Sequence, residues 1–461
     1  MARSRSARAL LVAALLGAAL LIRIGYIEHT PYHPVNDASS YNRLASEMAH
    51  TGDYDTKNGA GGSRGPTAYF PPAFPYFLAG VDILTGQESG HLPDIPGDRM
   101  AQAFLGTITV GLIGLVALEA FGAAAGLASL VLAAVYPVLI ELSGTLVAEN
   151  LLVVFELAAV WTALRIRDAR HPYAWITATG VLTGLATLTH QNAVLMLIPF
   201  TLAAWSVARN RPDRARPKVR ALAAPTILLI VTTCVTIAPW TIRNAIELHH
   251  FVPVSDELGI TLVGAYNPAS AAFTRVPYKW RYYANIPQDA KLQHNARQYT
   301  EVALGARLES QALHFISQHP LAPLEVALHN TLRMFELEGS YAWHASARAI
   351  GLHPAVARTG VEAFWVVCVL ALLGALTKTA RRGPRWLWLV PVLFALSVVF
   401  INVETPRFRE PIDPFLIMLA GCAVATAVQR LLLRGAPVRR GRRAPQLPRD
   451  TQLVEMGQRL A

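Results

Sequence analysis

The chain has 461 residues, of which 53% are hydrophobic and only 15% are charged. A soluble globular protein carries about a quarter of charged residues. Because long apolar runs recur from end to end, the composition excludes a set of soluble domains and predicts a polytopic membrane protein. The net charge of +11 does not indicate a nucleic-acid-binding protein, since the basic residues lie in short links between apolar runs, where they orient membrane helices.

The apolar runs are the first feature along the chain, and a helix needs roughly 20 mostly apolar residues to cross a bilayer. The first run follows Arg3, Arg5 and Arg8 and has the look of a signal peptide. It lacks a clear small-residue cleavage site, so we interpret it as a retained first span. The predicted spans are residues 9–27, 99–118, 121–140, 147–166, 174–189, 192–208, 221–240, 359–377, 386–402 and 411–433.

Residues 71–85 are ambiguous, because this segment is short, carries three prolines near its start and contains Asp82. If it does not cross the membrane, the basic clusters fall on one side; if it crosses, every later cluster moves to the side opposite the N-terminus. Basic loops favour the cytoplasmic side, so we predict an interfacial or re-entrant helix on the outer face. The clusters are Arg3 to Arg8, Arg165 to Arg170, Arg209 to Arg220, Lys378 to Arg385, and the tail from Arg430 onward.

This topology predicts four regions. Residues 1–240 form an N-terminal transmembrane module with a large first outer loop, residues 28–98. Residues 241–358 are too long for a bare linker and form an extracytoplasmic helical region. Residues 359–433 are the C-terminal transmembrane helices. Residues 434–461 form a basic, disordered cytoplasmic tail that can hold anionic lipid.

Three carboxylates stand out. Asp37 begins a stretch whose apolar residues recur at helical spacing, which predicts a helix lying on the membrane. Two interpretations of Asp37 are open, a helix N-cap and a chemically active carboxylate. Glu149 lies in a short predicted outer turn and is interpreted as functional. Glu156 is seven residues further on and faces the same way; because a charge inside a span costs roughly 2.5–3.5 kcal/mol, it faces a cavity or partner, or is a neutral packing residue.

Four cations lie at predicted outer helix ends, on the wrong side for the charge rule. His190 is in a tight turn, Arg243 follows a span, and Arg407 and Arg409 fill the turn 404–411. The arginine fork matches phosphate geometry, so cations kept in these places predict a phosphate-binding site. The alternative for Arg407 and Arg409 is local pairing with the glutamates of the same turn.

The remaining signals are weaker. Residues 259–268, which include Asn267, predict a structured loop able to contact a sugar. The glycine-rich segment 59–65 with Arg64 is more often a plain loop than a phosphate cradle. His249-His250 lacks metal-ligand spacing, and the three cysteines lie inside apolar runs without a disulfide or metal pattern. The sequence has no Walker loop, dinucleotide-binding glycine pattern or nucleophile elbow, which argues against soluble nucleotide-driven chemistry.

In their order and sidedness, these motifs resemble the bacterial family 39 glycosyltransferases of the C-type fold, which are related to the protein O-mannosyltransferases and the lipid A aminoarabinose transferase. The likeness extends to about residue 425. The chain departs from the family at His190-Gln191, where Arg-Pro is frequent, and at Asn36-Asp37, where some relatives have two acidic residues. The matching set is Asp37, Tyr41, Gly52-Asp53-Tyr54, Phe70 to Pro75, Tyr136-Pro137, Ala148-Glu149, Leu188 to His190, Pro239 to Asn244 and Arg407 to Pro411.

The resemblance implies an all-α polytopic membrane protein, a C-type glycosyltransferase-like bundle of about ten transmembrane helices with outer juxtamembrane helices. It implies transfer of a sugar from a polyprenyl-phosphate donor to an extracytoplasmic protein, lipid or cell-wall glycan at the plasma (inner) membrane of a bacterium. A carboxylate would take the acceptor proton, and cations would stabilise the leaving lipid phosphate. No cofactor is certain, and a divalent metal ion stays open. Asp37 and Glu149 are the expected catalytic residues and metal ligands, and the expected substrate or phosphate-binding residues are Tyr41, Arg64, His190, Arg243, Asn267, Arg407 and Arg409.

Two other classes of function stay open. Glu156 and the many spans fit a flippase or transporter of lipid-linked sugars, although the sequence shows no inverted halves and no paired broken helices, and the outer loops are large. A non-catalytic scaffold of a cell-envelope complex is the third class.

Overall fold

The computed structural model describes residues 2–56, 65–86, 95–209, 219–289, 291–292 and 298–435. This part of the chain is mostly helical. One two-stranded antiparallel sheet pairs β1 (Asp55–Thr56) with β2 (Gly65–Pro66). The predicted all-α fold is confirmed.

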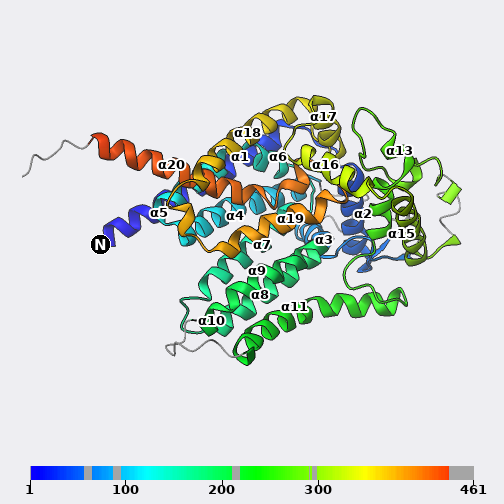
Figure 1. Ribbon diagram of the computed structural model, residues 1–461, viewed down its shortest axis with the longest axis horizontal. Helices are drawn as coiled ribbons and strands as arrows, with labels where there is room; N and C mark the ends of the chain where they lie inside the picture. The colour runs from blue at the N-terminus through cyan, green and yellow to red at the C-terminus, as the bar shows by residue number, and fades with distance from the viewer. Residues whose placement is uncertain are drawn as a thin grey trace, which may run out of the picture.

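Each predicted span coincides with one helix or with two or three consecutive helices (Figure 1). Within the described ranges, five helices are long and apolar enough to cross a membrane: α1, α4, α11, α18 and α20. The helices at the predicted spans are α1 (Ala2–His29), α4 (Ile95–Phe121), α5 (Ala123–Val135), α6 (Pro137–Leu142), α7 (Glu149–Arg165), α8 (Pro172–Thr189), η3 (Gln191–Met196), α9 (Leu197–Ala204), α10 (Ser206–Arg209), α11 (Val219–Glu247), α18 (Pro354–Ala375), η7 (Arg385–Trp388), α19 (Leu389–Val399) and α20 (Asp413–Gly435).

Two breaks in the helices shape the bundle end that holds the site. The span predicted at 121–140 ends as α5 at Val135 and restarts as α6 at Pro137, because proline has no N–H to continue the helical ladder. The chain breaks again at His190, whose backbone is extended between α8 and η3. His190 therefore leaves the helix axis at the point where the bundle meets the outer region.

The segment that the sequence left ambiguous is α3 (Ala73–Thr85), a helix of 13 residues. At 1.5 Å per residue it is too short to cross a bilayer. It packs against α2 (Asn36–Thr51) and α4, at the same end of the bundle as the outer helices (Figure 1). This length agrees with a helix that does not cross.

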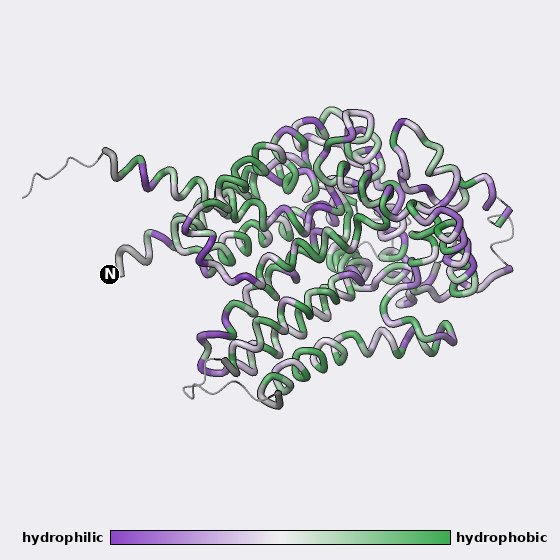
Figure 2. The backbone as a smooth tube through the Cα atoms, viewed as in Figure 1, coloured by the Kyte–Doolittle hydropathy of each residue, from purple (hydrophilic) through white to green (hydrophobic). Residues whose placement is uncertain are grey.

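One end of the bundle carries the basic links between helices, and the other end carries the outer helices. Figure 1 shows the N-terminus, α10 and the C-terminal end of α20 at the left end, with α2, α15 and α13 at the right end. The basic links around Arg165 and Arg385 lie between antiparallel helices at the left end, where Figure 2 shows hydrophilic turns between hydrophobic helices. The described basic clusters therefore share one end, as the chosen topology requires.

The outer segments pack together as one unit at the other end. A single hydrophobic core joins residues of the first loop, such as Tyr41 and Phe74, to residues of the second region, such as Ile260 and Leu308. Glu301 ties the two segments, since its carboxylate accepts hydrogen bonds from Thr67 Oγ1 (2.5 Å) and Ala68 N (2.8 Å). The second region contains α12 (Leu258–Ala265), α13 (Pro268–Ala271), η4 (Tyr283–Asn285), α15 (Glu301–Gln318), α16 (Ala322–Met334) and α17 (Ser340–Ala349).

Candidate active site

Asp37 is in the first turn of α2, but it does not cap the helix. The N-cap position is Val35, and no side chain makes a capping hydrogen bond there. The preceding Asn36 has a left-handed backbone (φ 50°), and its side chain donates to Ala349 O at 2.8 Å, which fixes the start of α2. The Asp37 carboxylate is left to point toward the bundle, so the N-cap interpretation of Asp37 is wrong.

Arg407 is the centre of the site, because its guanidinium joins two carboxylates. Nη1 donates to Asp37 Oδ2 at 2.6 Å, and Nε donates to Glu149 Oε1 at 2.7 Å. Nη2 lies 3.4 Å from the hydroxyl oxygen of Tyr41. Only 6% of the Arg407 side chain is exposed, against 1% for Glu149 and 40% for Asp37. Asp37 is therefore the carboxylate of the pair that a substrate can reach.

The alternative interpretation of Arg407, pairing with a glutamate of its own turn, is wrong, because its carboxylate partners come from α2 and α7. Glu149 begins α7, where the positive end of the helix dipole favours a carboxylate. Burial lowers the pKa of Arg407, but Glu149 and Asp37 outweigh this and raise it above its ordinary value. Arg407 therefore keeps its charge at every pH at which the protein is folded.

His190 lies beside this cluster, with Nε2 at 4.0 Å from Glu149 Oε1. Burial lowers the pKa of His190, and the nearby Glu149 only partly opposes this. Burial thus disfavours the charged imidazolium. His190 lines the cavity beside Arg407, but its burial opposes the predicted role as a cation.

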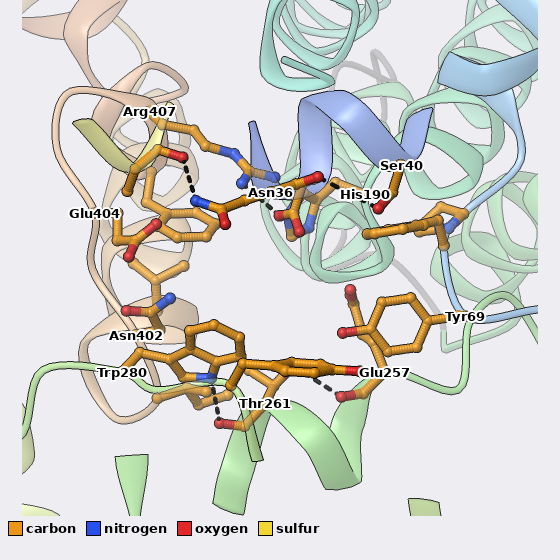
Figure 3. Close-up of a pocket in the computed structure, with 18 of the residues that line it drawn as sticks. Asn36, Ser40, Tyr69, His190, Glu257, Thr261, Trp280, Asn402, Glu404 and Arg407 are labelled. Atoms are coloured by element: carbon orange, nitrogen blue, oxygen red, sulfur yellow. Dashed lines mark hydrogen bonds and ion pairs between the residues drawn. The ribbon is translucent and has the colours of Figure 1, made fainter. Parts of the chain in front are cut away.

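A cavity of about 700 Å³ opens in front of these residues. Figure 3 shows Asn36, Ser40, His190 and Arg407 on one wall and Glu257, Thr261 and Trp280 on the opposite wall. The segments that line it are residues 36–43, 69–71, 189–192, 257–261, 279–285, 397–402 and 404–408. The first outer loop, the second outer region and the ends of bundle helices thus meet at one cavity.

Several lining residues were missed by the sequence analysis, among them Glu257 at the start of α12 and Lys279 and Trp280 in the loop that follows α13. Thr261 of α12 also lines the cavity, and it lies in the segment 259–268 that was predicted to contact a sugar. Burial, with a smaller contribution from the charge of Asp37 and against the opposing charge of Arg407, raises the pKa of Glu257 to about 7. The run Lys279-Trp280-Arg281-Tyr282 mixes cations with aromatic rings, which was the signal in the sequence that could have found this wall.

Two predicted phosphate ligands lie away from the cavity. Arg243 donates to Thr67 O (2.7 Å) and Tyr54 O (2.9 Å), and its guanidinium lies over the Trp240 ring at 4.9 Å. It thus holds the first outer loop against α11. This geometry corrects the expectation that Arg243 faces the donor phosphate.

Arg409 has turned to the opposite side of its short helix from Arg407. It pairs with Glu336 at 2.8 Å and with Asp413 at 3.1 Å, donates to Met334 O at 3.1 Å, and is 1% exposed. Its partners are not the glutamates of its own turn, and they leave it no free face for phosphate. The ion pairs of Arg409 with Glu336 and Asp413 therefore have a structural role, because they hold the turn that carries Arg407 in place.

Asn267 also serves its own loop. Its side chain caps α13 by accepting from Ser270 N at 2.8 Å and donates to Val263 O at 2.8 Å. It does not line the cavity, so its predicted contact with a sugar is not supported. Arg64 lies outside the described residues.

The guanidinium of Arg407 lies between the two carboxylates that were expected to share a metal ion. It donates to Asp37 Oδ2 and Glu149 Oε1, while Glu149 Oε2 is buried without a hydrogen-bond partner among the described residues. A divalent ion bound between the two acids would meet the guanidinium charge. In the described ranges no group of three or more His, Cys, Asp or Glu residues is arranged to hold a metal ion.

Comparison with known proteins agrees with this architecture. Residues 70–240, less than half of the chain, match the family model described as dolichyl-phosphate-mannose-protein mannosyltransferase. This chain resembles the family 39 glycosyltransferases. The expected resemblance is confirmed, and the matched range contains Glu149 and His190. No curated protein sequence matches the chain.

Solved structures place the fold. The archaeal oligosaccharyltransferase AglB from Archaeoglobus fulgidus, in complex with an inhibitory peptide and a dolichol-phosphate, is similar with a TM-score of 0.55 at 14% identity, over 93% of this chain and 51% of that chain. A structure of the same oligosaccharyltransferase with Zn and sulfate has a TM-score of 0.51 at 14% identity, over 91% and 50% of the two chains. ArnT from Cupriavidus metallidurans, bound to undecaprenyl phosphate, has a TM-score of 0.41 at 16% identity, over 91% and 78%.

The chain spans about half the length of the oligosaccharyltransferase chains that it matches. At this level of identity the likeness shows the fold, which is the C-type glycosyltransferase fold. The apolar helices and this fold together make the chain a multi-pass membrane protein.

Proposed function

We propose that this protein is an integral membrane glycosyltransferase that transfers a sugar from a polyprenyl-phosphate donor to a hydroxyl-bearing acceptor. The observation that carries the proposal is the Asp37–Arg407–Glu149 cluster on the wall of a cavity at one end of a membrane bundle. The family match and the lipid phosphates bound by similar structures support a lipid-linked donor. The acceptor is an extracytoplasmic protein, lipid or cell-wall glycan.

The side of the membrane follows from charge. The described basic links lie at the end that carries the start of α1 and the end of α20, and such links favour the cytoplasmic side. The cavity is at the other end, so the proposed site faces the extracytoplasmic side of the plasma membrane of a bacterium. There it meets lipid-linked donors, which need no soluble nucleotide.

Asp37 is the proposed base. The acceptor O–H loses its proton to the Asp37 carboxylate while the acceptor oxygen forms a bond to the anomeric carbon of the sugar. The bond between that carbon and the phosphate oxygen breaks, and the electron pair leaves with polyprenyl phosphate. Arg407 holds the Asp37 carboxylate in place at 2.6 Å, and Glu149 fixes Arg407 from the buried side.

The leaving phosphate needs positive charge. Arg407 supplies part of it, and Lys279 adds a second cation on the cavity wall. The Lys279 Nζ lies 3.4 Å from Glu404 Oε1, and 21% of the Lys279 side chain is exposed. A phosphate that enters the cavity can therefore replace Glu404 as the partner of the Lys279 ammonium group. We therefore assign the donor phosphate to Arg407 and Lys279, in place of Arg243 and Arg409.

Proteoliposomes containing the purified protein test the proposal. They are supplied with labelled undecaprenyl-phosphate hexoses and pentoses and with an extract of envelope acceptors. A transferase moves the label from the lipid to the acceptor. Movement of the labelled lipid across the bilayer without a glycosylated product would instead identify a flippase.

A further inference from the structure

The wall of the cavity opposite Arg407 has a different chemistry from the reacting side. It presents an indole ring, a carboxylate and a hydroxyl, from Trp280, Glu257 and Thr261 (Figure 3). None of these three residues belongs to the motifs that carry the family resemblance. Glu257, Thr261 and Gly264 are spaced by four and three residues, so they lie on the same face of α12. The Trp280 ring packs on this face at Gly264.

Trp280 is held rigidly. Its indole Nε1 donates to Thr261 O at 3.1 Å, and the next residue, Arg281, donates its backbone N–H to Gly264 O at 3.1 Å. The ring rests directly on Gly264, where an added Cβ would lie 2.1 Å from Nε1 and 2.5 Å from Cδ1. The ring is thus clamped onto α12 while part of its surface lines the cavity, which makes it a fixed flat platform.

Glu257 supplies directed hydrogen bonding beside the ring. It stands at the N-terminal end of α12, and its Oε1 accepts from Gln191 Nε2 at 3.2 Å. Glu257 also lines the cavity, so its carboxyl group lies within reach of a bound molecule. Because its pKa is raised to about 7, the carboxyl group both accepts and donates hydrogen bonds near neutral pH.

A flat aromatic face and neighbouring carboxyl and hydroxyl groups match the two sides of a sugar ring. The C–H groups on one face of a pyranose carry partial positive charge and pack on the negative face of an indole. The hydroxyl groups at the ring edge form directed hydrogen bonds. A pocket of this kind combines apolar contact with a few placed polar groups, as small-molecule sites do.

We infer that Trp280, Glu257 and Thr261 form the subsite that holds the sugar ring of the substrate, a hexose or pentose. The inference rests on the proposed function, because it assigns the sugar to the wall opposite Asp37. Trp280 stacks on the ring, and Glu257 bonds to its hydroxyl groups. The sugar then lies between the platform and the Asp37–Arg407 pair, with its phosphate directed to Arg407 and Lys279.

Saturation-transfer NMR on the protein in lipid nanodiscs tests the subsite directly. Nanodiscs are needed because detergents with sugar headgroups would compete. The probes are methyl α-D-mannopyranoside, methyl β-D-glucopyranoside and methyl β-L-arabinopyranoside. Trp280→Ala and Glu257→Ala should weaken binding of the preferred glycoside by about tenfold each, and Trp280→Phe, which keeps an aromatic ring, should weaken it less.

Trp365→Ala is the matched control, because the Trp365 indole also donates to a backbone carbonyl, Phe335 O at 3.0 Å, but does not line the cavity. Binding that survives Trp365→Ala and is lost in Trp280→Ala supports the subsite. Equal binding in all variants, or no glycoside bound by the wild-type protein, overturns it.

A kinetic arm separates this inference from the proposed function. With a polyprenyl-phosphate sugar as donor, the subsite predicts that Trp280→Ala raises the donor KM about tenfold. Transfer with an unchanged KM in Trp280→Ala and Glu257→Ala would refute the subsite and leave the transferase standing. Glycoside binding that depends on Trp280, in a protein that transfers no sugar from any lipid donor, would keep the subsite and refute the transferase.

Discussion

Arg407 and Asp37 are 370 positions apart in the sequence, and their side chains meet at 2.6 Å between Nη1 and Oδ2. The same guanidinium donates to Glu149 at 2.7 Å. Glu149 is buried, whereas 40% of the Asp37 side chain is exposed. Glu149 can therefore hold Arg407 in place, and Asp37 is the carboxylate that a substrate can reach.

Loss of Arg407 should destabilise the protein through Glu149. Arg407→Gln leaves a carboxylate that is 1% exposed without its charged partner, which should cost about 3–5 kcal/mol. The double variant Arg407→Gln/Glu149→Gln removes the uncompensated charge and should recover much of that loss. Unfolding in denaturant in nanodiscs measures this coupling. Strictly additive effects of the two substitutions would show that the pair does not interact.

Arg409 and Lys279 should separate stability from donor binding. Arg409→Gln breaks buried contacts with Glu336 and Asp413 and should lower stability, while the donor KM of the folded protein stays within about twofold of wild type. Lys279→Gln removes a partly exposed cation on the cavity wall and should raise the donor KM with little loss of stability. A higher KM in Arg409→Gln, at unchanged stability, would return Arg409 to the phosphate site.

Glu301 should make stability depend on pH. Burial raises the pKa of Glu301 to about 7, although Thr67 and Ala68 donate to its carboxylate. The folded state then holds a proton that the unfolded state, with a pKa near 4.5, has released. The contribution of Glu301 to stability is therefore greatest below about pH 4.5 and is lost as the pH rises toward about 7.

Glu301→Gln removes the titrating group and keeps one oxygen that can accept from Ala68 N, while its amide NH2 would donate to the Thr67 hydroxyl instead of accepting from it. At pH 8 it should be more stable than wild type by up to about 3 kcal/mol, and most of this difference should vanish by pH 5. Thermal unfolding at several pH values measures it, with Glu247→Gln at an exposed position as the control. A stability difference that does not change with pH would contradict this assignment.

Gly264→Ala should damage the wall formed by Trp280, Glu257 and Thr261 without replacing any of its side chains. The new Cβ would overlap the Trp280 ring, at 2.1 Å from Nε1, so the ring must move. The variant should therefore reproduce much of the loss of glycoside binding of Trp280→Ala. Gly80→Ala is the control, since its Cβ would meet nothing within 4 Å. Wild-type binding in Gly264→Ala would mean that the position of the ring is unimportant.

The sequence predicted the helices and about half of the site. Hydrophobic runs located the spans, because a helix that crosses a bilayer needs about 20 mostly apolar residues whatever its neighbours are. Asp37, Tyr41, His190 and Arg407 line one cavity, and Glu149 contacts Arg407 from its buried side.

Arg243, Arg407 and Arg409 all lie at predicted outer helix ends, but they bind different partners that the local sequence does not reveal. Arg409 pairs with Glu336, and Arg243 binds the backbone of Thr67, in each case through contacts between distant segments. Trp280 and Glu257 were missed because their meeting depends on the close packing of a loop on Gly264 of α12. A sequence pattern marks a cation at a helix end, but only the packed structure shows which partner occupies it.

The most direct test of the central claim is transfer by Asp37→Asn. Asparagine keeps the shape of the side chain and an oxygen that can accept from Arg407, but it cannot take the acceptor proton. In membranes with a labelled polyprenyl-phosphate sugar, the account predicts that Asp37→Asn folds like wild type and loses about 10²- to 10⁴-fold of the transfer rate. A transfer rate close to that of wild type would remove Asp37 from the chemistry and contradict the account.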